Sequence, residues 1–229
     1  MRSATIGTSS RAVEIPLGRV KLDGDLEVPA GAVGVVLFAH GSGSSRMSPR
    51  NQFVARVLRE RKLGTLLFDL LTPREEVADA MSGHLRFDIE LLAQRLAAAT
   101  RWLAEELPEV PAIGYFGASS GGAAALAAAA ELGPAIAAVV SRGGRPDLAG
   151  PALARVRAPT LLIVGSRDGH VLELNRDALG QLRCEKRLHV VEGATHLFEE
   201  PGALDEVAGE ASAWLREHME GERRKGAES

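Results

Sequence analysis

The sequence predicts an α/β fold, a doubly wound and mainly parallel sheet with helices on both faces and an antiparallel hairpin at its N-terminal edge. Two observations support this prediction. Short, nearly continuous apolar runs alternate along the chain with longer segments in which apolar residues recur every three or four positions. Continuous apolar runs are typical of strands buried on both faces, and their alternation with helices favours a parallel sheet.

The elements can be placed in order along the chain. Predicted buried strands cover residues 33–39, 65–70, 113–116, 136–140, 159–164 and 187–191. Predicted helices cover residues 51–61, 87–107, 120–132, 172–182 and 204–219. Each helix is long enough to cross from one parallel strand to the next. We therefore expect helices on both faces of the sheet.

The N-terminal part has a different pattern. Residues 13–28 alternate apolar and polar side chains, with Asp23-Gly24 near the centre. Alternation around an Asp-Gly pair predicts a β-hairpin, which we expect to add an antiparallel edge to the sheet.

Length and spacing predict one domain. A chain of 229 residues is close to the size of a single domain, and we expect that domain to cover residues 13–217. Residues 1–12 are predicted to be a flexible N-terminus, and residues 218–229 a charged, flexible tail. Residues 141–158 form too short a connection for a cap domain. The pocket is therefore expected to be shallow and open.

Composition excludes several classes of function. Hydrophobic residues make up 45% of the chain and charged residues 25%, as in ordinary globular proteins. The formal net charge of -3 provides no cationic field for nucleic acid or a membrane surface, so neither is an expected partner. The single cysteine, Cys184, cannot form an intramolecular disulfide. With no secretory signal pattern and no apolar stretch able to span a bilayer, the expected location is cytoplasmic.

The strongest chemical motif is Gly117-Ala118-Ser119-Ser120-Gly121, between a predicted strand and an alanine-rich helix. It fits G-x-S-x-G, in which small flanking residues permit a sharp turn that exposes the serine hydroxyl. Ser119 could instead simply cap the helix. Ser120 also has small residues two positions away, but Ser119 has glycine at both, which favours Ser119 as the nucleophile.

Two further residues follow predicted strands, Asp168 after residues 159–164 and His196 after residues 187–191. Ligands of doubly wound sheets bind at the carboxyl ends of strands. The chain order Ser119, Asp168, His196 is the order that nucleophile-elbow hydrolases require. Each residue alone has an ordinary interpretation, a turn aspartate or a surface histidine. Asp147, after the preceding strand, is an alternative acid.

An oxyanion-binding turn is predicted at His40-Gly41-Ser42, directly after the first buried strand. We expect the backbone amides of Ser42 and Ser120 to be the donors and His40 to shape the turn. The stretch lacks the Gly-Lys-Ser/Thr ending of a phosphate-binding loop, and Arg46 stands where a dinucleotide fingerprint has its third glycine. No cofactor is therefore expected.

Substrate contacts are predicted for His40, Gly41, Arg46 and Arg142. Both arginines follow strand ends, where a guanidinium can bind a carboxylate or phosphate, so an anionic ester is a hypothesis. The alternative is that the arginines pair with nearby acids or stay solvated. No two histidines have metal-ligand spacing with a supporting acid or cysteine, so no metal site is expected.

Taken together, these motifs make residues 13–217 resemble the α/β-hydrolase superfamily. Residues 39–51 (AHGSGSSRMSPRN) are similar to the small, uncapped dienelactone-hydrolase-like proteins. Some proteins of that type are fused to a phosphoribosyltransferase-like domain, which has no counterpart in this sequence. The resemblance implies a cysteine nucleophile, whereas this chain has Ser119, and Cys184 falls in a predicted helix-to-strand connection. Lactone specificity is therefore not carried over.

Residues and resemblance together imply a serine hydrolase acting on a small or exposed ester. His196, oriented by Asp168, would take the proton of Ser119 as it attacks the carbonyl, and an acyl-enzyme would follow. The alternative is a non-catalytic binding module on the same scaffold. Esterase, thioesterase and lactonase share nucleophile, base and oxyanion hole, so the sequence leaves the substrate open, and it leaves the oligomeric state open as well.

Overall fold

In the computed structural model, which describes residues 9–228, eight strands form one sheet in the order β1-β2-β4-β3-β5-β6-β7-β8. The strands are β1 (Ser9–Leu17), β2 (Val20–Val28), β3 (Val35–Ala39), β4 (Gly64–Phe68), β5 (Ile113–Ala118), β6 (Ala138–Arg142), β7 (Thr160–Gly165) and β8 (Lys186–Val191). Strands β3 to β8 are parallel, and β2 pairs antiparallel with both β1 and β4. The predicted fold class is confirmed.

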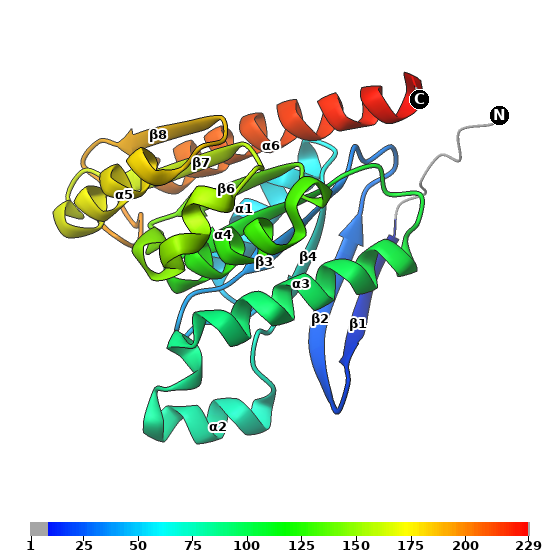
Figure 1. Cartoon of the computed structure of the whole chain (residues 1–229), viewed down its shortest axis with the longest axis horizontal. Helices are drawn as coiled ribbons and strands as arrows, with labels where there is room; N and C mark the ends of the chain where they lie inside the picture. Colours follow the sequence, from blue (N-terminus) through cyan, green and yellow to red (C-terminus); the bar gives the residue numbers. More distant parts are fainter. Residues whose placement is uncertain (1–8, 229) are drawn as a thin grey trace.

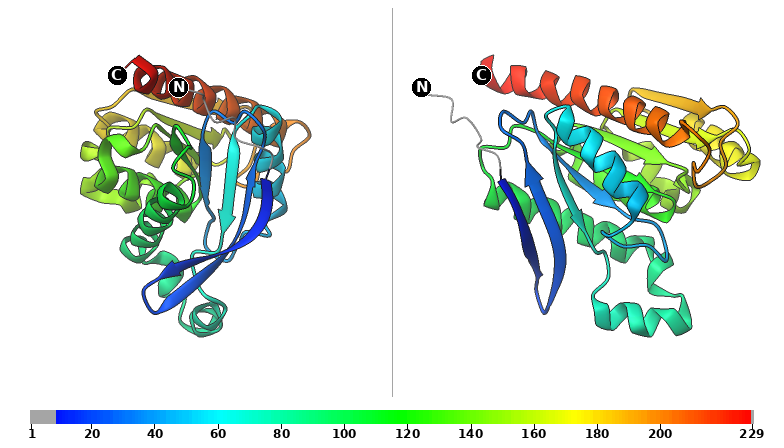
Figure 2. Two further views of the ribbon diagram at one scale, coloured as in Figure 1. Left: turned by 90° about the vertical axis from the view of Figure 1, so that its right-hand side faces the viewer. Right: turned by 180° about the vertical axis from the view of Figure 1, so that it is seen from behind.

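Helices cover both faces of the sheet (Figures 1 and 2). They are α1 (Pro49–Glu60), α2 (Pro73–Ser82), α3 (Ile89–Glu106), α4 (Ser120–Leu132), α5 (Gly169–Gln181) and α6 (Ala203–Glu228), with 3-10 segments η1 (Leu85–Phe87), η2 (Gly133–Ala135) and η3 (Pro146–Arg155). Helices α1 and α6 pack on one face, and α3, α4 and α5 on the other. Within the described residues no helix is long and apolar enough to cross a membrane.

The central strands are apolar because both of their faces are covered. Every residue of β3, β4, β6 and β7 is buried, whereas most of the edge strand β8 is partly exposed. A large hydrophobic core therefore lies on each face of the sheet. This arrangement holds the carboxyl ends of the parallel strands in one row, where loops can present chemistry.

The hairpin turn lies at residues 18–19 and not at Asp23-Gly24, so that part of the sequence prediction is wrong. Gly18 has a φ of 64° and allows the turn. Gly24 lies within β2, paired with Val13 and Phe68. A Cβ at Gly24 would lie 3.0 Å from the Cβ of Phe68, so this glycine permits close packing between strands.

At both ends of the chain the described elements extend past the predicted domain boundaries. Strand β1 begins at Ser9, which pairs with Val28, so residues 9–12 belong to the sheet, and the rest of the predicted flexible N-terminus lies outside the described residues. At the other end, α6 continues to Glu228, and Met219 is fully buried in the core. Packing of Met219 extends the domain beyond residue 217.

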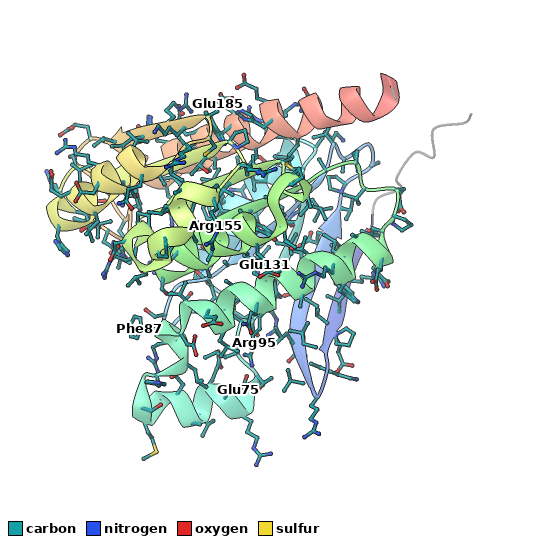
Figure 3. The ribbon with its side chains drawn as sticks, in the orientation of Figure 1. Glu75, Phe87, Arg95, Glu131, Arg155 and Glu185 are labelled. Atoms are coloured by element: carbon teal, nitrogen blue, oxygen red, sulfur yellow. The ribbon has the colours of Figure 1, made fainter. Side chains whose placement is uncertain are left out.

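The sequence prediction missed α2, which projects from the body of the protein beside α3 (Figure 1). Thr72 and Glu75 form a capping box at its start, with Pro73 in the first turn. Glu75 also pairs with Arg95 of α3 (Figure 3). Asp79 is the one buried residue of α2, so the helix lacks the apolar periodicity that reveals a core helix.

Candidate active site

Ser119 sits on a strained turn between β5 and α4. Its φ of 52° and ψ of -123° lie outside the regions that non-glycine residues normally occupy. Its side chain makes no capping hydrogen bond to α4. The hydroxyl therefore does not cap the helix. Backbone strain of this kind is typical of functional positions.

Glycines on either side make the turn possible. A Cβ at Gly121 would lie 2.1 Å from the carbonyl oxygen of Ala39, and one at Gly117 would lie 2.5 Å from the carbonyl oxygen of Gly121. The positive φ falls on Ser119, whereas Ser120 is the first residue of α4 and is buried. The backbone geometry thus distinguishes Ser119, which lies on the strained turn, from Ser120, which belongs to the helix.

Asp168 and His196 are in direct contact. The Nδ1 of His196 lies 2.6 Å from Oδ2 of Asp168. An ionised carboxylate only accepts hydrogen bonds, so Nδ1–H donates and Nε2 is left able to accept a proton. The side chain of Asp168 is 16% exposed to solvent and that of His196 is 39% exposed. The carboxylate is therefore mostly buried, while the imidazole is accessible from solvent.

Asp147, the alternative acid, has another partner. Both of its carboxylate oxygens accept hydrogen bonds from the guanidinium of Arg145, at 2.9 and 2.7 Å. Of the two candidate acids, Asp168 is therefore the one that contacts His196.

Ser119 and His196 lie on either side of the end of β6. The backbone N–H of Ser119 donates to the carbonyl oxygen of Arg142 at 3.2 Å. The next residue, Gly143, is so close to His196 that a Cβ there would lie 3.5 Å from the imidazole Cε1. Three residues far apart in the sequence are thus gathered at the carboxyl edge of the sheet.

The turn after β3 lies directly against Ser119. A Cβ at Gly41 would lie 3.0 Å from the Cβ of Ser119. The buried ring of His40 accepts a hydrogen bond from the N–H of Leu70 at Nε2, which leaves Nδ1–H to donate to the carbonyl oxygen of Gly41, both at 3.0 Å. Burial lowers the pKa of His40, which favours this neutral form. His40 thus ties the turn to the end of β4.

The two predicted oxyanion donors differ in their surroundings. The N–H of Ser42 donates to Oγ of Ser120 at 2.9 Å, so it already has a partner. The N–H of Ser120 is the first of α4, where an amide has no carbonyl partner within its own helix. This amide is therefore ready to bind a negative charge.

The two predicted substrate-binding arginines also differ. Arg46 pairs with Asp69 and lies 3.4 Å from Asp25, so nearby acids already compensate its charge. Arg142 is buried at the end of β6, and its Nε and Nη1 have no hydrogen-bond partner among the described residues. The structure thus favours the local-pairing alternative for Arg46 and leaves Arg142 as the arginine without an acid.

A cavity of about 330 Å³ opens beside the oxyanion turn. Residues 40–45 form one wall, and Leu70, Leu71 and Leu92 provide apolar lining. Asp79 and Arg86, joined by a 2.5 Å hydrogen bond, close it on the side of α2 and η1. The α2 segment therefore forms a wall of this cavity, which the sequence prediction of a shallow pocket did not include. The cavity adjoins the turn of residues 40–45, and Ser119, Asp168 and His196 are not among its lining residues.

Six large apolar side chains remain exposed in the described part of the chain. They are Met47, Val77, Met81, Phe87, Leu148 and Leu197. All six lie in segments that follow the carboxyl ends of strands, and Leu197 is next to His196.

Comparison with known proteins shows the family of this chain. The family model described as the dienelactone hydrolase family matches residues 66–219. A curated Mycobacterium tuberculosis protein, provisionally named a phosphoribosyl transferase, is 54% identical over 209 residues, which cover 90% of this chain and 46% of that protein. The chain therefore spans about half the length of the curated relatives it matches.

Solved structures show the same fold. The crystal structure of a dienelactone hydrolase from Anabaena variabilis is 57% identical, with a TM-score of 0.89, and the match covers 92% of this chain and 98% of that one. Est1E from Butyrivibrio proteoclasticus is 18% identical, with a TM-score of 0.76 and coverage of 91% and 98%. A Pyrococcus furiosus esterase is 20% identical, with a TM-score of 0.72 and coverage of 93% and 92%. At such low identity the last two show similarity of fold alone.

Proposed function

Because the chain belongs to the dienelactone hydrolase family, we propose that it is a serine hydrolase that cleaves a small or exposed ester through Ser119, His196 and Asp168. The observation that carries the proposal is the 2.6 Å contact between His196 Nδ1 and Asp168 Oδ2. That contact sets the tautomer that a general base needs, and Ser119, the proposed nucleophile, stands on a strained turn at the same edge of the sheet.

In the first step, Nε2 of His196 takes the proton of the Ser119 hydroxyl as Oγ attacks the carbonyl carbon of the ester. Asp168 holds the ring in position and stabilises the imidazolium that forms. A base placed in this way contributes about 10²- to 10⁴-fold to the rate. The collapse of the tetrahedral intermediate then transfers the proton to the leaving alcohol and leaves an acyl group on Ser119.

The negative oxygen of the intermediate would be bound by the N–H groups of Ser120 and Ser42. The Ser42 amide donates to the neutral Oγ of Ser120 in the resting protein. A charged oxygen is a stronger acceptor than a hydroxyl, so the developing oxyanion would compete successfully for this donor. Such a donor contributes about 10²- to 10³-fold to kcat.

In the second step, His196 takes a proton from water as the water oxygen attacks the acyl carbon, and then gives that proton to Oγ of Ser119 as the bond between Oγ and the acyl group breaks and the acid is released. Water is the co-reactant of the two steps, and the proposed residues need no cofactor for either of them. The cavity of about 330 Å³ is at the small end of the usual range for ligand sites, which favours a small acyl or alcohol group.

The name of the Mycobacterium tuberculosis relatives describes proteins about twice as long as this chain. Residues 66–219 match the hydrolase family model. We therefore propose hydrolysis, and not phosphoribosyl transfer, as the reaction of this chain.

Labelling with a fluorophosphonate probe, measured by intact mass, tests the proposal. We expect one covalent adduct on the unmodified protein and on the control Ser82→Ala, which changes an exposed serine of α2, and no adduct on Ser119→Ala. Hydrolysis of 4-nitrophenyl acetate should be lost with the adduct. Absence of both labelling and turnover in the unmodified protein would favour the non-catalytic binding module instead.

A further inference from the structure

Arg142 occupies an unusual place for a cation. Its residue is 8% exposed at the carboxyl end of β6. Val140, two positions earlier on the same face of the strand, packs in the core with Phe38 and Phe116 beneath α1 and α6. The guanidinium of Arg142 therefore lies on the α1 side of the sheet, above that core.

Within residues 9–228 the structure shows no acid paired with this buried charge. Among the described residues no ion pair includes Arg142, its Nε and Nη1 are buried without a hydrogen-bond partner, and its nearest ring contact is Phe198, 5.8 Å from the guanidinium carbon. Arg95 is equally buried, yet it donates to both oxygens of Glu75 and to the carbonyl of Leu70. Buried arginines are normally paired as Arg95 is, and Arg142 departs from that rule within the described part of the chain.

The charge of Arg142 persists at neutral pH. Burial, followed by the nearby positive charge of Arg50, lowers the pKa of the Arg142 guanidinium to about 10. That pKa still leaves the group protonated at pH 7, so an uncompensated cation stands in a site of low dielectric constant.

Arg142 is close to the reaction centre and to the start of α1. Its own carbonyl oxygen accepts the N–H of Ser119. Arg50, in the first turn of α1, pairs at 3.2 Å with Glu199, whose side chain is 65% exposed. Arg142 lies close enough to Arg50 for the charge of Arg50 to lower its pKa, and its guanidinium lies over the ring of Phe198, in the loop after His196. Two cations, one at the end of β6 and one at the start of α1, thus lie near each other.

We propose that Arg142, together with Arg50, forms an anion-binding subsite that takes a phosphate group of the substrate. Guanidinium groups favour phosphate, and two cations match its double charge better than the single charge of a carboxylate. Glu199 is exposed enough to turn away from Arg50. The role of this subsite in substrate binding rests on the hydrolase function proposed above.

Binding of inorganic phosphate, measured by calorimetry at low ionic strength, tests the subsite directly. We expect phosphate to bind the unmodified protein and to bind Arg142→Met about tenfold more weakly or worse, because the buried donor is gone. The matched control is Arg145→Met, which removes an arginine already paired with Asp147 and should leave phosphate binding unchanged. Equal binding by the unmodified protein and Arg142→Met would overturn the proposal, as would no binding at all.

Two further measurements keep the test decisive. If Arg142→Met does not fold, Arg50→Met changes a residue nearer the surface and should weaken phosphate binding at least threefold; unchanged binding would contradict the subsite. Acetate should bind at least tenfold more weakly than phosphate, and equal affinity would overturn the assignment to phosphate.

The subsite and the hydrolase can fail separately. Ser119→Ala removes the proposed nucleophile but no group of the subsite, so it should bind phosphate as the unmodified protein does. If Ser119 is labelled but phosphate binding does not depend on Arg142, the proposed hydrolase function is supported and the proposed subsite is contradicted. If phosphate binding depends on Arg142 but no serine is labelled, the anion site is supported and the hydrolase function is contradicted.

Discussion

His196 Nδ1 lies 2.6 Å from Asp168 Oδ2, although the two residues are 28 positions apart. The sheet sets this distance, because β7 and β8 are adjacent parallel strands paired as far as Gly165 and Val191. The loops that follow are joined by a hydrogen bond from the N–H of Arg167 to the carbonyl oxygen of Ala194. The imidazole and its acid are therefore positioned by backbone pairing, which is more rigid than two free loops would be.

Asp168→Asn should lower kcat for 4-nitrophenyl acetate by about 10³- to 10⁴-fold. The amide keeps the shape of the carboxylate but does not favour the tautomer with Nε2 free, and it does not stabilise an imidazolium. Steady-state kinetics measure the loss. Asp147→Asn is the control, since Asp147 pairs with Arg145 and should retain activity within about twofold. Equal losses in both variants would contradict the assignment of Asp168.

Gly41→Ala should lower kcat by about 10²- to 10³-fold while the protein stays folded. The new methyl group would lie 3.0 Å from the Cβ of Ser119 and 3.1 Å from the carbonyl oxygen of Ala118, so the turn must move and its amides leave their positions. Gly180→Ala is the control, because nothing lies within 4 Å of a Cβ there. Kinetics and thermal melting of both variants check the prediction, and a fully active Gly41→Ala would contradict it.

Stability at acidic pH should depend on Glu75. Its hydrogen bonds with Arg95, and then with Thr72, lower the pKa of this carboxyl from 4.5 to about 2. Because folding lowers this pKa, the ionised carboxylate of Glu75 stabilises the folded protein. The stabilisation is complete above pH 4.5 and is lost as the pH falls from 4.5 towards 2. The free energy of unfolding of Glu75→Gln at pH 7 should therefore be about 1–3 kcal/mol lower than that of the unmodified protein.

Urea unfolding between pH 2 and 7 measures this effect. The difference between the unmodified protein and Glu75→Gln should shrink as the pH approaches 2, because the glutamate is then protonated. Glu105→Gln, at an exposed position of α3, is the control and should follow the unmodified protein. A difference that stays constant over this range would show that Glu75 does not stabilise the fold through its charge.

Tyr115→Phe should cost about 0.5–1.5 kcal/mol of stability and little activity. The buried hydroxyls of Tyr115 and Thr100 lie 2.6 Å apart, and because Thr100 donates to the carbonyl oxygen of Leu96, the tyrosine must be the donor to Thr100. Urea unfolding of Tyr115→Phe, Thr100→Val and the double variant gives the coupling energy. If the loss of unfolding free energy in the double variant equals the sum of the losses in the two single variants, the two hydroxyls do not stabilise each other.

Much of the candidate site could be located from the sequence because its signals are local. Ser119 stands between glycines, and Asp168 and His196 each follow a buried apolar run, so all three could be placed at strand ends from the sequence. Helix α2 could have been found from Thr72, Pro73 and Glu75, which mark a helix start. It was missed because a helix that buries only Asp79 has no apolar periodicity.

The hairpin turn and the arginines show the limit of local signals. Asp23-Gly24 has a turn-forming composition, yet β2 continues through it because Gly24 fits closely between Val13 and Phe68. Arg46 and Arg142 look alike in sequence, but one contacts Asp69 and the other contacts no acid among the described residues. Which partner a side chain finds depends on elements distant in the sequence.

The sequence by itself thus determined the parallel sheet and the order of Ser119, Asp168 and His196, because hydrophobic periodicity and glycine spacing act over a few residues. The tertiary structure alone decided that His196 contacts Asp168, that Ser42 donates to Ser120, and that no acid of the described residues pairs with the guanidinium of Arg142. These relationships arise from strand register and from the packing of separate elements, which local patterns in a single sequence do not encode.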